Sequence, residues 1–109
     1  MQARRVGARY WDIIDSALGA MMWVDFTTVR GKVVDYTVIL VLKTDSGLET
    51  IRVYDAAHGF NEMHRYTREG GKQPGVEIHR GTLGEGMRAA KADIKSRFLS
   101  MIEGWERWR

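Results

Sequence analysis

The chain has no cysteine among its 109 residues. This absence excludes disulfide bonds, zinc sites built from thiolates and catalysis by a thiol nucleophile. The chain also has no long apolar segment, since its longest run, residues 37–42, is far shorter than the roughly 20 residues that span a bilayer. Three arginines lie near the N-terminus, but no continuous apolar region or cleavage site follows them, so a secretory signal is not expected. We therefore expect a cytoplasmic protein.

The chain has only a small excess of positive charge, with a formal net charge of +3 and a sequence pI of about 9.4. This mild basic balance permits an acidic partner such as RNA, DNA or an acidic protein. The hydrophobic content of 44% and the charged content of 28% are ordinary for a globular protein and argue against disorder. We find no internal repeat or linker, and we predict a single domain over residues 1–109.

The first segment is predicted to be a helix over residues 8–22, because apolar residues recur there at spacings of three and four. Tyr10, Ile14, Ala17, Leu18 and Met21 carry this pattern. Glycines at 7 and 19 would weaken the helix by roughly 1 kcal/mol each if they fell inside it, so it requires packing to hold it.

Alternating apolar and polar residues predict three strands in the middle of the chain. The first begins at Trp23 and ends before Arg30-Gly31, the second covers residues 32–43, and the third covers residues 48–55. The second strand is the longest, and we expect it to be central. Residues 44–47 have the composition of a hairpin turn. Residues 56–74 show no period and are predicted to be a long loop, followed by a short edge strand at residues 76–80.

The clearest predicted element is a C-terminal helix. Thr82 and Glu85 have the spacing of a capping box, in which each side chain satisfies a free backbone N–H at a helix start. An apolar stripe then recurs every three or four residues at Leu83, Met87, Ala90, Ile94, Phe98, Met101 or Ile102, and Trp105. The sequence therefore predicts an α+β fold: an N-terminal helix, a small antiparallel sheet of three to four strands, and a long amphipathic C-terminal helix packed on the sheet.

The polar residues after the strand 48–55 are the candidates for catalysis, because rigid strand ends often position functional loops. His58 and His64 have the chemistry of a general base and acid near neutral pH. Asp55 could orient one of the two imidazoles, and Arg65 could stabilise the negative charge of a phosphorane. This set suits metal-free, ribonuclease-type transesterification. The alternative is that residues 55–59 form only a turn, in which the Asp caps a backbone N–H and the Gly adopts a positive φ.

The same region offers carboxylate and imidazole ligands for zinc or manganese, including Glu62. Its spacing matches no specific pattern such as H-E-x-x-H. No metal or other cofactor is therefore expected.

Two further groups of residues are candidates for binding. Basic side chains that could hold phosphate or nucleic acid are Lys72, His79, Arg80, Arg88, Lys91 and Lys95. The last three share one face of the predicted helix, although such a face is also typical of a helix side exposed to solvent. Trp105 and Trp108 could form an interface with a partner or with a second copy of the chain, and a frayed chain end is the alternative for Trp108.

The run Val53-Tyr54-Asp55-Ala56-Ala57-His58-Gly59, followed by His64, resembles the small TumE-like toxins of bacterial toxin–antitoxin pairs. Members are about this long and place Tyr-Asp-Asn-Ala-His at a strand end, with further histidines in the loop that follows. Here Ala56 stands at the position of the usual Asn, and the loop histidines are reduced to two. The resemblance covers mainly residues 33–66 and implies a toxin that a DNA-binding antitoxin neutralises.

From the cluster and the resemblance, we expect a toxin-like component of a toxin–antitoxin or related defence module, acting on RNA. Its expected partners are RNA, an antitoxin or other protein, and a second copy of the chain. The alternative is a small basic regulator without enzymatic activity, such as a phage-encoded inhibitor that binds protein or nucleic acid.

Overall fold

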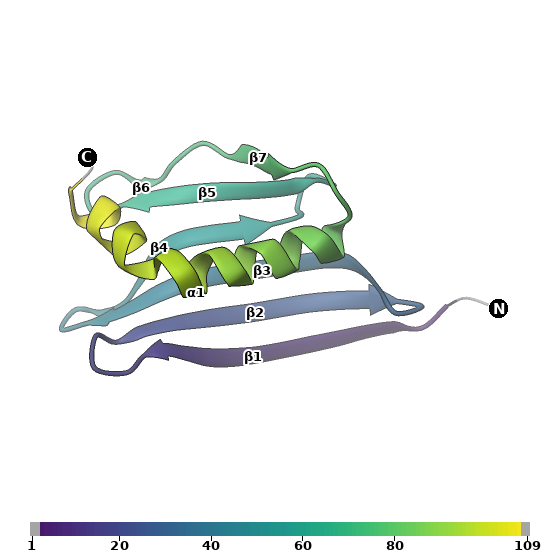
Figure 1. Cartoon of the computed structure of the whole chain (residues 1–109), viewed down its shortest axis with the longest axis horizontal. Coiled ribbons are helices and arrows are strands. Elements are labelled where there is room, and N and C mark those ends of the chain that lie inside the picture. The colour runs from purple at the N-terminus through teal and green to yellow at the C-terminus, as the bar shows by residue number, and fades with distance from the viewer. Residues whose placement is uncertain (1–2, 108–109) are drawn as a thin grey trace.

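In a computed structural model, residues 3–107 form one antiparallel sheet with a single helix lying across it (Figure 1). The strands are β1 (Arg5–Asp15), β2 (Ala20–Val29), β3 (Lys32–Thr44), β4 (Gly47–Asp55), β5 (Asn61–Thr67), β6 (Gly71–Lys72) and β7 (Val76–His79), and the helix is α1 (Leu83–Arg107). Among the described residues, no helix is long and apolar enough to cross a membrane.

The strands follow one another across the sheet in the order β1-β2-β3-β4-β5-β6, so β3 is an inner strand as expected. The last edge is divided between two short strands. β7 pairs with the first half of β5, and β6 pairs with its end. The chain then passes from β7 into α1, which runs back over the sheet (Figure 1).

The predicted N-terminal helix is wrong, because its residues form the hairpin of β1 and β2. The apolar residues that recur at spacings of three and four belong to β1, to the turn and to β2, so their helical period is a coincidence. Gly19 lies inside the predicted helix range with φ of 83°, and its N–H donates to the Asp15 carbonyl oxygen at 3.0 Å. The Leu18 N–H donates to the Asp15 carboxylate at 3.0 Å. This turn reverses the chain where a helix would have continued, and the sheet has seven strands instead of three or four.

The predicted loop over residues 56–74 is also wrong from residue 61 onward, where the chain forms β5 and β6. Four polar residues of β5 are buried: Asn61, Glu62, His64 and Thr67. Strand patterns are recognised from buried apolar residues, so a strand whose buried positions are polar lacks the expected signal.

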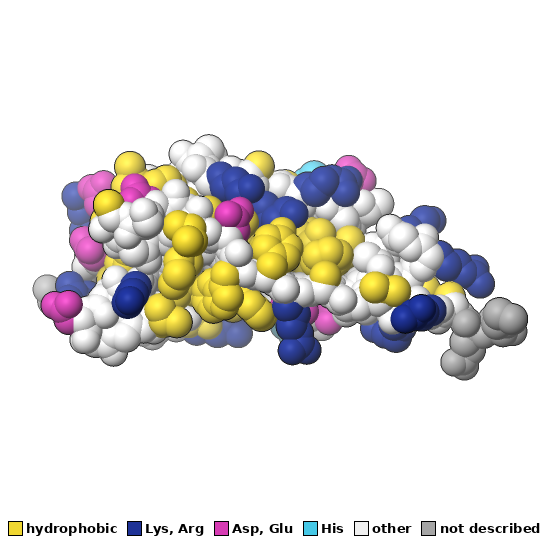
Figure 2. Space-filling model, turned by 90° about the horizontal axis from the view of Figure 1, so that it is seen from below, with side chains coloured by type: hydrophobic (Ala, Val, Ile, Leu, Met, Phe, Trp, Pro, Cys, Tyr) yellow, Lys and Arg dark blue, Asp and Glu magenta, His cyan; other side chains and the backbone are white. Residues whose placement is uncertain are grey.

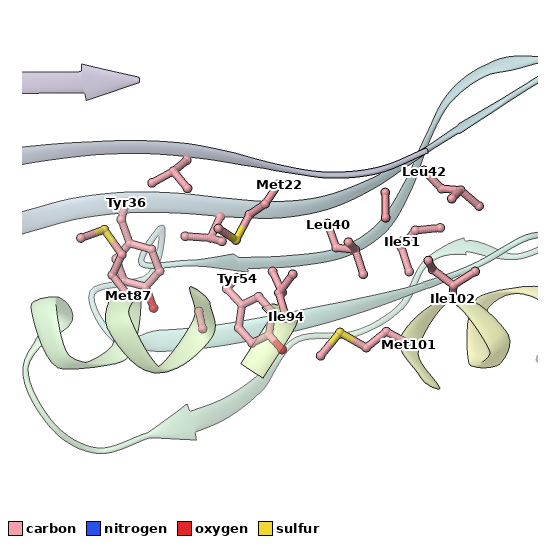
Figure 3. Packing of buried hydrophobic residues seen from close by; sticks show 14 of the residues in the cluster. Met22, Tyr36, Leu40, Leu42, Ile51, Tyr54, Met87, Ile94, Met101 and Ile102 are labelled. Carbon is pink, nitrogen blue, oxygen red and sulfur yellow. The ribbon is translucent and has the colours of Figure 1, made fainter. Parts of the chain in front are cut away.

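The C-terminal helix is confirmed, and its apolar stripe packs on the centre of the sheet (Figure 3). Tyr36, Val38 and Leu40 alternate along β3 and are at most 1% exposed. They meet Met87, Ile94 and Met101 of α1 within one core cluster. The predicted stripe therefore faces the sheet, as amphipathic helices do when one side lies on a core.

The two faces of the sheet differ in what covers them. We call the side under α1 the helix face and the other side the open face. Trp11, Trp23, Ile39, Val53 and His64 occupy one cross-strand row on the open face, from β1 to β5. Since successive side chains of a strand point to opposite faces, this row alternates with the core residues of the helix face.

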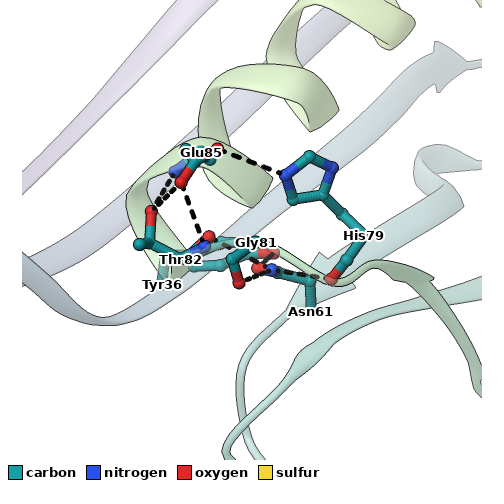
Figure 4. A network of polar contacts seen from close by, with 6 residues as sticks. All are labelled: Tyr36, Asn61, His79, Gly81, Thr82 and Glu85. Carbon is teal, nitrogen blue, oxygen red and sulfur yellow. Dashed lines mark hydrogen bonds and ion pairs between the residues drawn. The ribbon is translucent and has the colours of Figure 1, made fainter.

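A buried carboxamide joins the sheet to the start of α1 (Figure 4). The Tyr36 hydroxyl donates to Asn61 Oδ1 at 2.8 Å. The Asn61 amide nitrogen lies 3.0 Å from the His79 carbonyl oxygen, 3.3 Å from that of Gly81 and 3.2 Å from that of Thr82. Burial raises the pKa of Tyr36 to about 12, with a smaller effect from the charge of Asp55, so the hydroxyl remains a donor.

Gly86 allows α1 to approach this carboxamide. A Cβ built at Gly86 would lie 1.9 Å from Asn61 Oδ1. We expect Gly86→Ala to lower the free energy of unfolding by about 1–3 kcal/mol, because overpacking displaces a buried, hydrogen-bonded group. Gly84→Ala is the matched control, since its Cβ would meet Arg88 at an ordinary 3.5 Å. Urea denaturation should show the control unchanged or slightly stabilised by its higher helix propensity. Equal losses in the two variants would contradict the role of this close approach.

The capping box predicts a dependence of stability on pH. Glu85 N–H donates to Thr82 Oγ1 at 3.1 Å, and the Thr82 N–H and hydroxyl both approach Glu85 Oε1. The backbone hydrogen bond from Thr82, followed by the bond from its hydroxyl, lowers the pKa of Glu85 below 4.5. The carboxylate therefore stabilises the fold above pH of about 4.5, and this contribution is lost as the pH falls through the lowered pKa.

We expect Glu85→Gln, which keeps a hydrogen-bonding side chain, to be less stable than the wild type at pH 7, and this deficit should shrink as the pH falls below about 4.5. Glu106→Gln is the control, because Glu106 lies at the opposite end of α1, where the helix dipole disfavours negative charge. At pH 7, Glu106→Gln should therefore raise the free energy of unfolding slightly, whereas Glu85→Gln lowers it. Denaturation curves at several pH values measure both differences, and a Glu85→Gln deficit that persists at low pH would refute the argument.

Candidate functional site

Two carboxylates and two histidines meet where β4 ends and β5 begins. Asp55 lies opposite Glu62 across the two strands, and Val53 lies opposite His64. Paired residues of neighbouring antiparallel strands point to the same face. Asp55, Glu62 and His64 therefore share the open face, and one ligand atom from each of the three lies within 4.8 Å of the others.

Glu62 is the centre of this cluster. Its Oε1 atom lies 2.6 Å from His64 Nε2 and 3.2 Å from His58 Nδ1. The side chains of Glu62 and His64 are only 8% and 10% exposed, whereas that of His58 is 66% exposed. His64 is thus enclosed, and His58 presents the rest of its ring to solvent.

The environment keeps Glu62 ionised. Burial by itself would raise the pKa of this carboxyl, but the hydrogen bonds from His64 and His58 outweigh burial, so the pKa of Glu62 lies below 4.5. An ionised carboxylate accepts hydrogen bonds only. Glu62 therefore accepts the proton of His58 Nδ1 and leaves Nε2 of that ring directed away from it.

The backbone encloses the cluster from the side of β6 and β7. His64 Nδ1 lies 3.0 Å from the Gln73 carbonyl oxygen. A Cβ built at Gly75 would lie 2.5 Å from Glu62 Cδ and 2.7 Å from His64 Cε1. Only glycine fits here without displacing one of these side chains.

The turn expected at residues 55–59 is also present. The Ala57 N–H donates to Asp55 Oδ1 at 3.1 Å, and Gly59 has φ of 84°. Asp55 therefore shapes the turn that carries His58. Glu62, and not Asp55, contacts the imidazole of His58 and orients it.

Arg65 does not join the catalytic candidates. It pairs with Arg52, one position along β5 from His64, so its side chain points to the helix face. There it lines a cavity of about 280 Å³ together with Arg52, Arg97 and Trp105. The sheet separates this cavity from the two histidines.

The basic candidates near the end of the sheet are spread out. Lys72 pairs with Tyr66 at the end of β5. His79 pairs with Asn61, on the helix face, and its Nε2 lies 3.8 Å from Glu85. Arg80 is almost fully exposed and lies 3.8 Å from Glu77. His79 and Arg80 line one hollow beside Asn61, and Lys72 does not contribute to it.

The basic face of α1 contacts β1. Lys91 Nζ lies 3.2 Å from the Tyr10 hydroxyl, and Lys95 Nζ lies 3.3 Å from Asp12. Both lysines thus tie the helix to the edge strand. Arg88 is exposed near the start of α1.

Of the two candidate interface tryptophans, Trp105 is buried at 6% exposure and belongs to the core. Its carbonyl oxygen accepts the Arg68 N–H at 3.0 Å, and the Arg68 guanidinium lies 5.7 Å from its ring centroid. It therefore closes the core and is not free to anchor a partner. Trp108 lies outside the described residues.

Sequence reasoning missed a different aromatic surface. Trp11 and Trp23 face each other on the open face with ring centroids 5.0 Å apart, and Trp11 is 49% exposed. Seen from below, with β1 at the edge, the molecule carries a band of hydrophobic side chains bordered by lysines and arginines (Figure 2). Ile13, which shares the open face with Trp11, is also exposed. The alternation of Trp11, Asp12 and Ile13 would have indicated this surface if the segment had been read as a strand.

The fold and the cluster together define a class of protein: a single antiparallel sheet with one helix on one face and an acidic-histidine site on the other. The chain belongs to the family described as "Domain of unknown function (DUF7718)", whose model matches residues 6–109. No curated protein and no solved structure matches the chain.

Proposed function

We propose that the protein is a toxin-like component of a toxin–antitoxin or defence module that cleaves RNA in the cytoplasm, with His58 as its general base. The observation that carries this proposal is the dyad of His58 and Glu62. A buried carboxylate holds one ring nitrogen at 3.2 Å while the imidazole remains 66% exposed. Catalytic bases in hydrolytic triads are oriented by a carboxylate in the same way.

The chemistry that fits this dyad is attack within the RNA strand. His58 Nε2 takes the proton of a 2′-hydroxyl, and the 2′-oxygen forms a bond to the adjacent phosphorus. The bond from phosphorus to the 5′-oxygen breaks, giving a 2′,3′-cyclic phosphate, and a proton from water completes the 5′-hydroxyl. General acid–base catalysis of this kind contributes about 10²–10⁴-fold to a rate.

His64 has a different role from the one expected. It is enclosed, with its two nitrogens directed at Gln73 and Glu62. We assign His64 the role of fixing the position of the Glu62 carboxylate and of lowering its pKa through their hydrogen bond. A hollow beside the cluster is lined by Arg5, Thr37, Asp55 and Gly59, and Arg5 is the cation placed to contact an RNA phosphate there.

The open face suits single-stranded RNA. Bases stack on aromatic side chains with little sequence preference. The Trp11–Trp23 pair on β1 and β2 shares its cross-strand row with His64 on β5, so three strand spacings, about 14 Å, separate β2 from β5. A strand of two to three nucleotides reaches this far.

The edge of the sheet offers a place for a protein partner such as an antitoxin. β1 is 11 residues long, and within residues 3–107 it pairs only with β2. An extended segment of a partner can add to such an edge through main-chain hydrogen bonds. We propose this edge, and not the end of α1, as the surface for a partner or a second copy, because Trp105 is buried.

The first test is bacterial growth under inducible expression at matched protein levels. The wild type should arrest growth and cleave RNA. His58→Ala should relieve the arrest and reduce purified cleavage activity by about 100-fold or more. His79→Ala is the matched control, because this histidine lies on the helix face near Glu85, and it should behave as the wild type.

Arrest and cleavage that persist in His58→Ala would overturn the assignment of the base. If the wild type neither arrests growth nor cleaves RNA, the toxin proposal fails.

The observation that favours the alternative, a binding module without enzymatic activity, is the aromatic open face.

That surface has its own test. Trp11→Ala should weaken binding of a single-stranded RNA by roughly 5- to 150-fold, because one base loses its stacking partner. Leu99→Ala is the control, since Leu99 is 62% exposed on α1 and should leave affinity unchanged. Fluorescence anisotropy at two salt concentrations measures both variants, and identical affinities would exclude the open face as the RNA surface. RNA binding by the wild type without cleavage would support the binding module.

A further inference from the structure

Asp55 and Glu62 form a like-charged pair that the fold places face to face. They are directly opposite each other on neighbouring strands and point to the same face. Like charges in this position are destabilising. Glu62 is also buried, so its charge has little access to water. A positive charge between the two carboxylates would remove this conflict.

The hydrogen bonds of His64 show the same need for a cation. Its Nδ1 faces the Gln73 carbonyl oxygen, which accepts only, so this nitrogen carries a proton. Its Nε2 faces the Glu62 carboxylate at 2.6 Å, another acceptor. A neutral imidazole has one proton, and its second nitrogen would then point a lone pair at a carboxylate. A metal ion between His64 Nε2 and Glu62 Oε1 would give both atoms a partner.

The surroundings of His64 are those of a metal ligand. Histidines that bind metals commonly donate their other ring N–H to a backbone carbonyl, which fixes the tautomer and the ring orientation. The contact with Gln73 supplies this support, and Gly75 packs against both His64 and Glu62. The ligand atoms of Asp55, Glu62 and His64 already lie within 4.8 Å of one another. Atoms that bind Zn²⁺ at about 2.0–2.2 Å are spaced by about 3.3–3.6 Å. Binding therefore requires His64 Nε2 and Glu62 Oε1 to separate from 2.6 Å and the most distant ligand atoms to move closer together.

We propose that Asp55, Glu62 and His64 bind a divalent first-row transition metal, with Zn²⁺ or Mn²⁺ as the ions suited to oxygen and imidazole ligands. The site has no thiolate, because the chain has no cysteine. His58 stands beside it as an exposed neighbour of Glu62. Metal binding stands on the ligand geometry alone.

A role for this ion in RNA cleavage rests on the proposed function. Because Arg65 faces the other side of the sheet, it cannot stabilise the charge that develops on the phosphate. A metal ion at the cluster would supply that positive charge on the open face.

The test is metal binding by the whole protein. After removal of metals with a chelator and dialysis, Zn²⁺ and Mn²⁺ are titrated separately, and bound metal is counted by elemental analysis. We expect one ion per chain and a rise in Tm with metal concentration, as mass action requires for a ligand of the folded state. Asp55→Asn and Glu62→Gln should each weaken binding at least 100-fold. Asn at position 55 can still accept the Ala57 N–H, so the turn should survive.

Two controls separate this site from adventitious surface binding. Asp45→Asn removes an exposed carboxylate from another turn, and His79→Ala removes a histidine from the helix face. Both should bind metal as the wild type does. The inference is overturned if neither ion binds, or if the controls lose as much affinity as the cluster variants.

Cleavage assays keep the two proposals apart. RNA cleavage that is fully retained in metal-free protein would overturn the catalytic role of the ion and leave the proposed function standing. Stoichiometric metal binding without any cleavage would support the metal site and contradict the ribonuclease.

Discussion

The buried carboxamide of Asn61 is the contact on which the arrangement of the other elements depends. It accepts a hydrogen bond from Tyr36 in β3 and donates to the carbonyl groups that lead from β7 into α1. A buried amide with a missing partner costs about 1–3 kcal/mol, so these partners must stay together. The same contact requires a glycine at position 86, where the helix passes over the amide. One side chain thereby fixes where α1 begins and how it lies on the sheet.

The candidate site follows from that anchor. With Asn61 held on the helix face, the next residue of β5 must point to the open face, and so must His64 two positions further on. Their neighbours in β4 are set by the strand register, which places Asp55 opposite Glu62. The anchor and the site are therefore two sides of one short strand. A shift of one residue in the pairing of β5 would bury the charged cluster under α1 and expose the anchor.

Some of this was predictable from particular residues. The capping box at Thr82 and Glu85 and the apolar stripe of α1 follow local rules that need no knowledge of the rest of the chain. The same holds for the inner strand β3, in which buried Tyr36, Val38 and Leu40 alternate along the chain. The N-terminal hairpin was not predictable in this way, because Tyr10, Ile14 and Leu18 fit a helical period by coincidence across a turn. β5 escaped detection because its buried residues are polar, and the partners of Asn61 are distant in sequence.

The sequence by itself determined the elements whose stabilising contacts are local or periodic: the long helix, its start and the central strand. It also determined the chemical inventory, with histidines and carboxylates but no thiols. Only the tertiary structure decided which of these groups meet. The pairing of β4 with β5 places His64 and Glu62 beside Asp55 and sends Arg65 to the other side of the sheet. The physical reason is that consecutive residues of a strand point to opposite faces of the sheet, which separates Arg65 from His64 although they are neighbours in sequence. The register between strands decides which side chains from different strands lie side by side, as it does for Asp55 and Glu62.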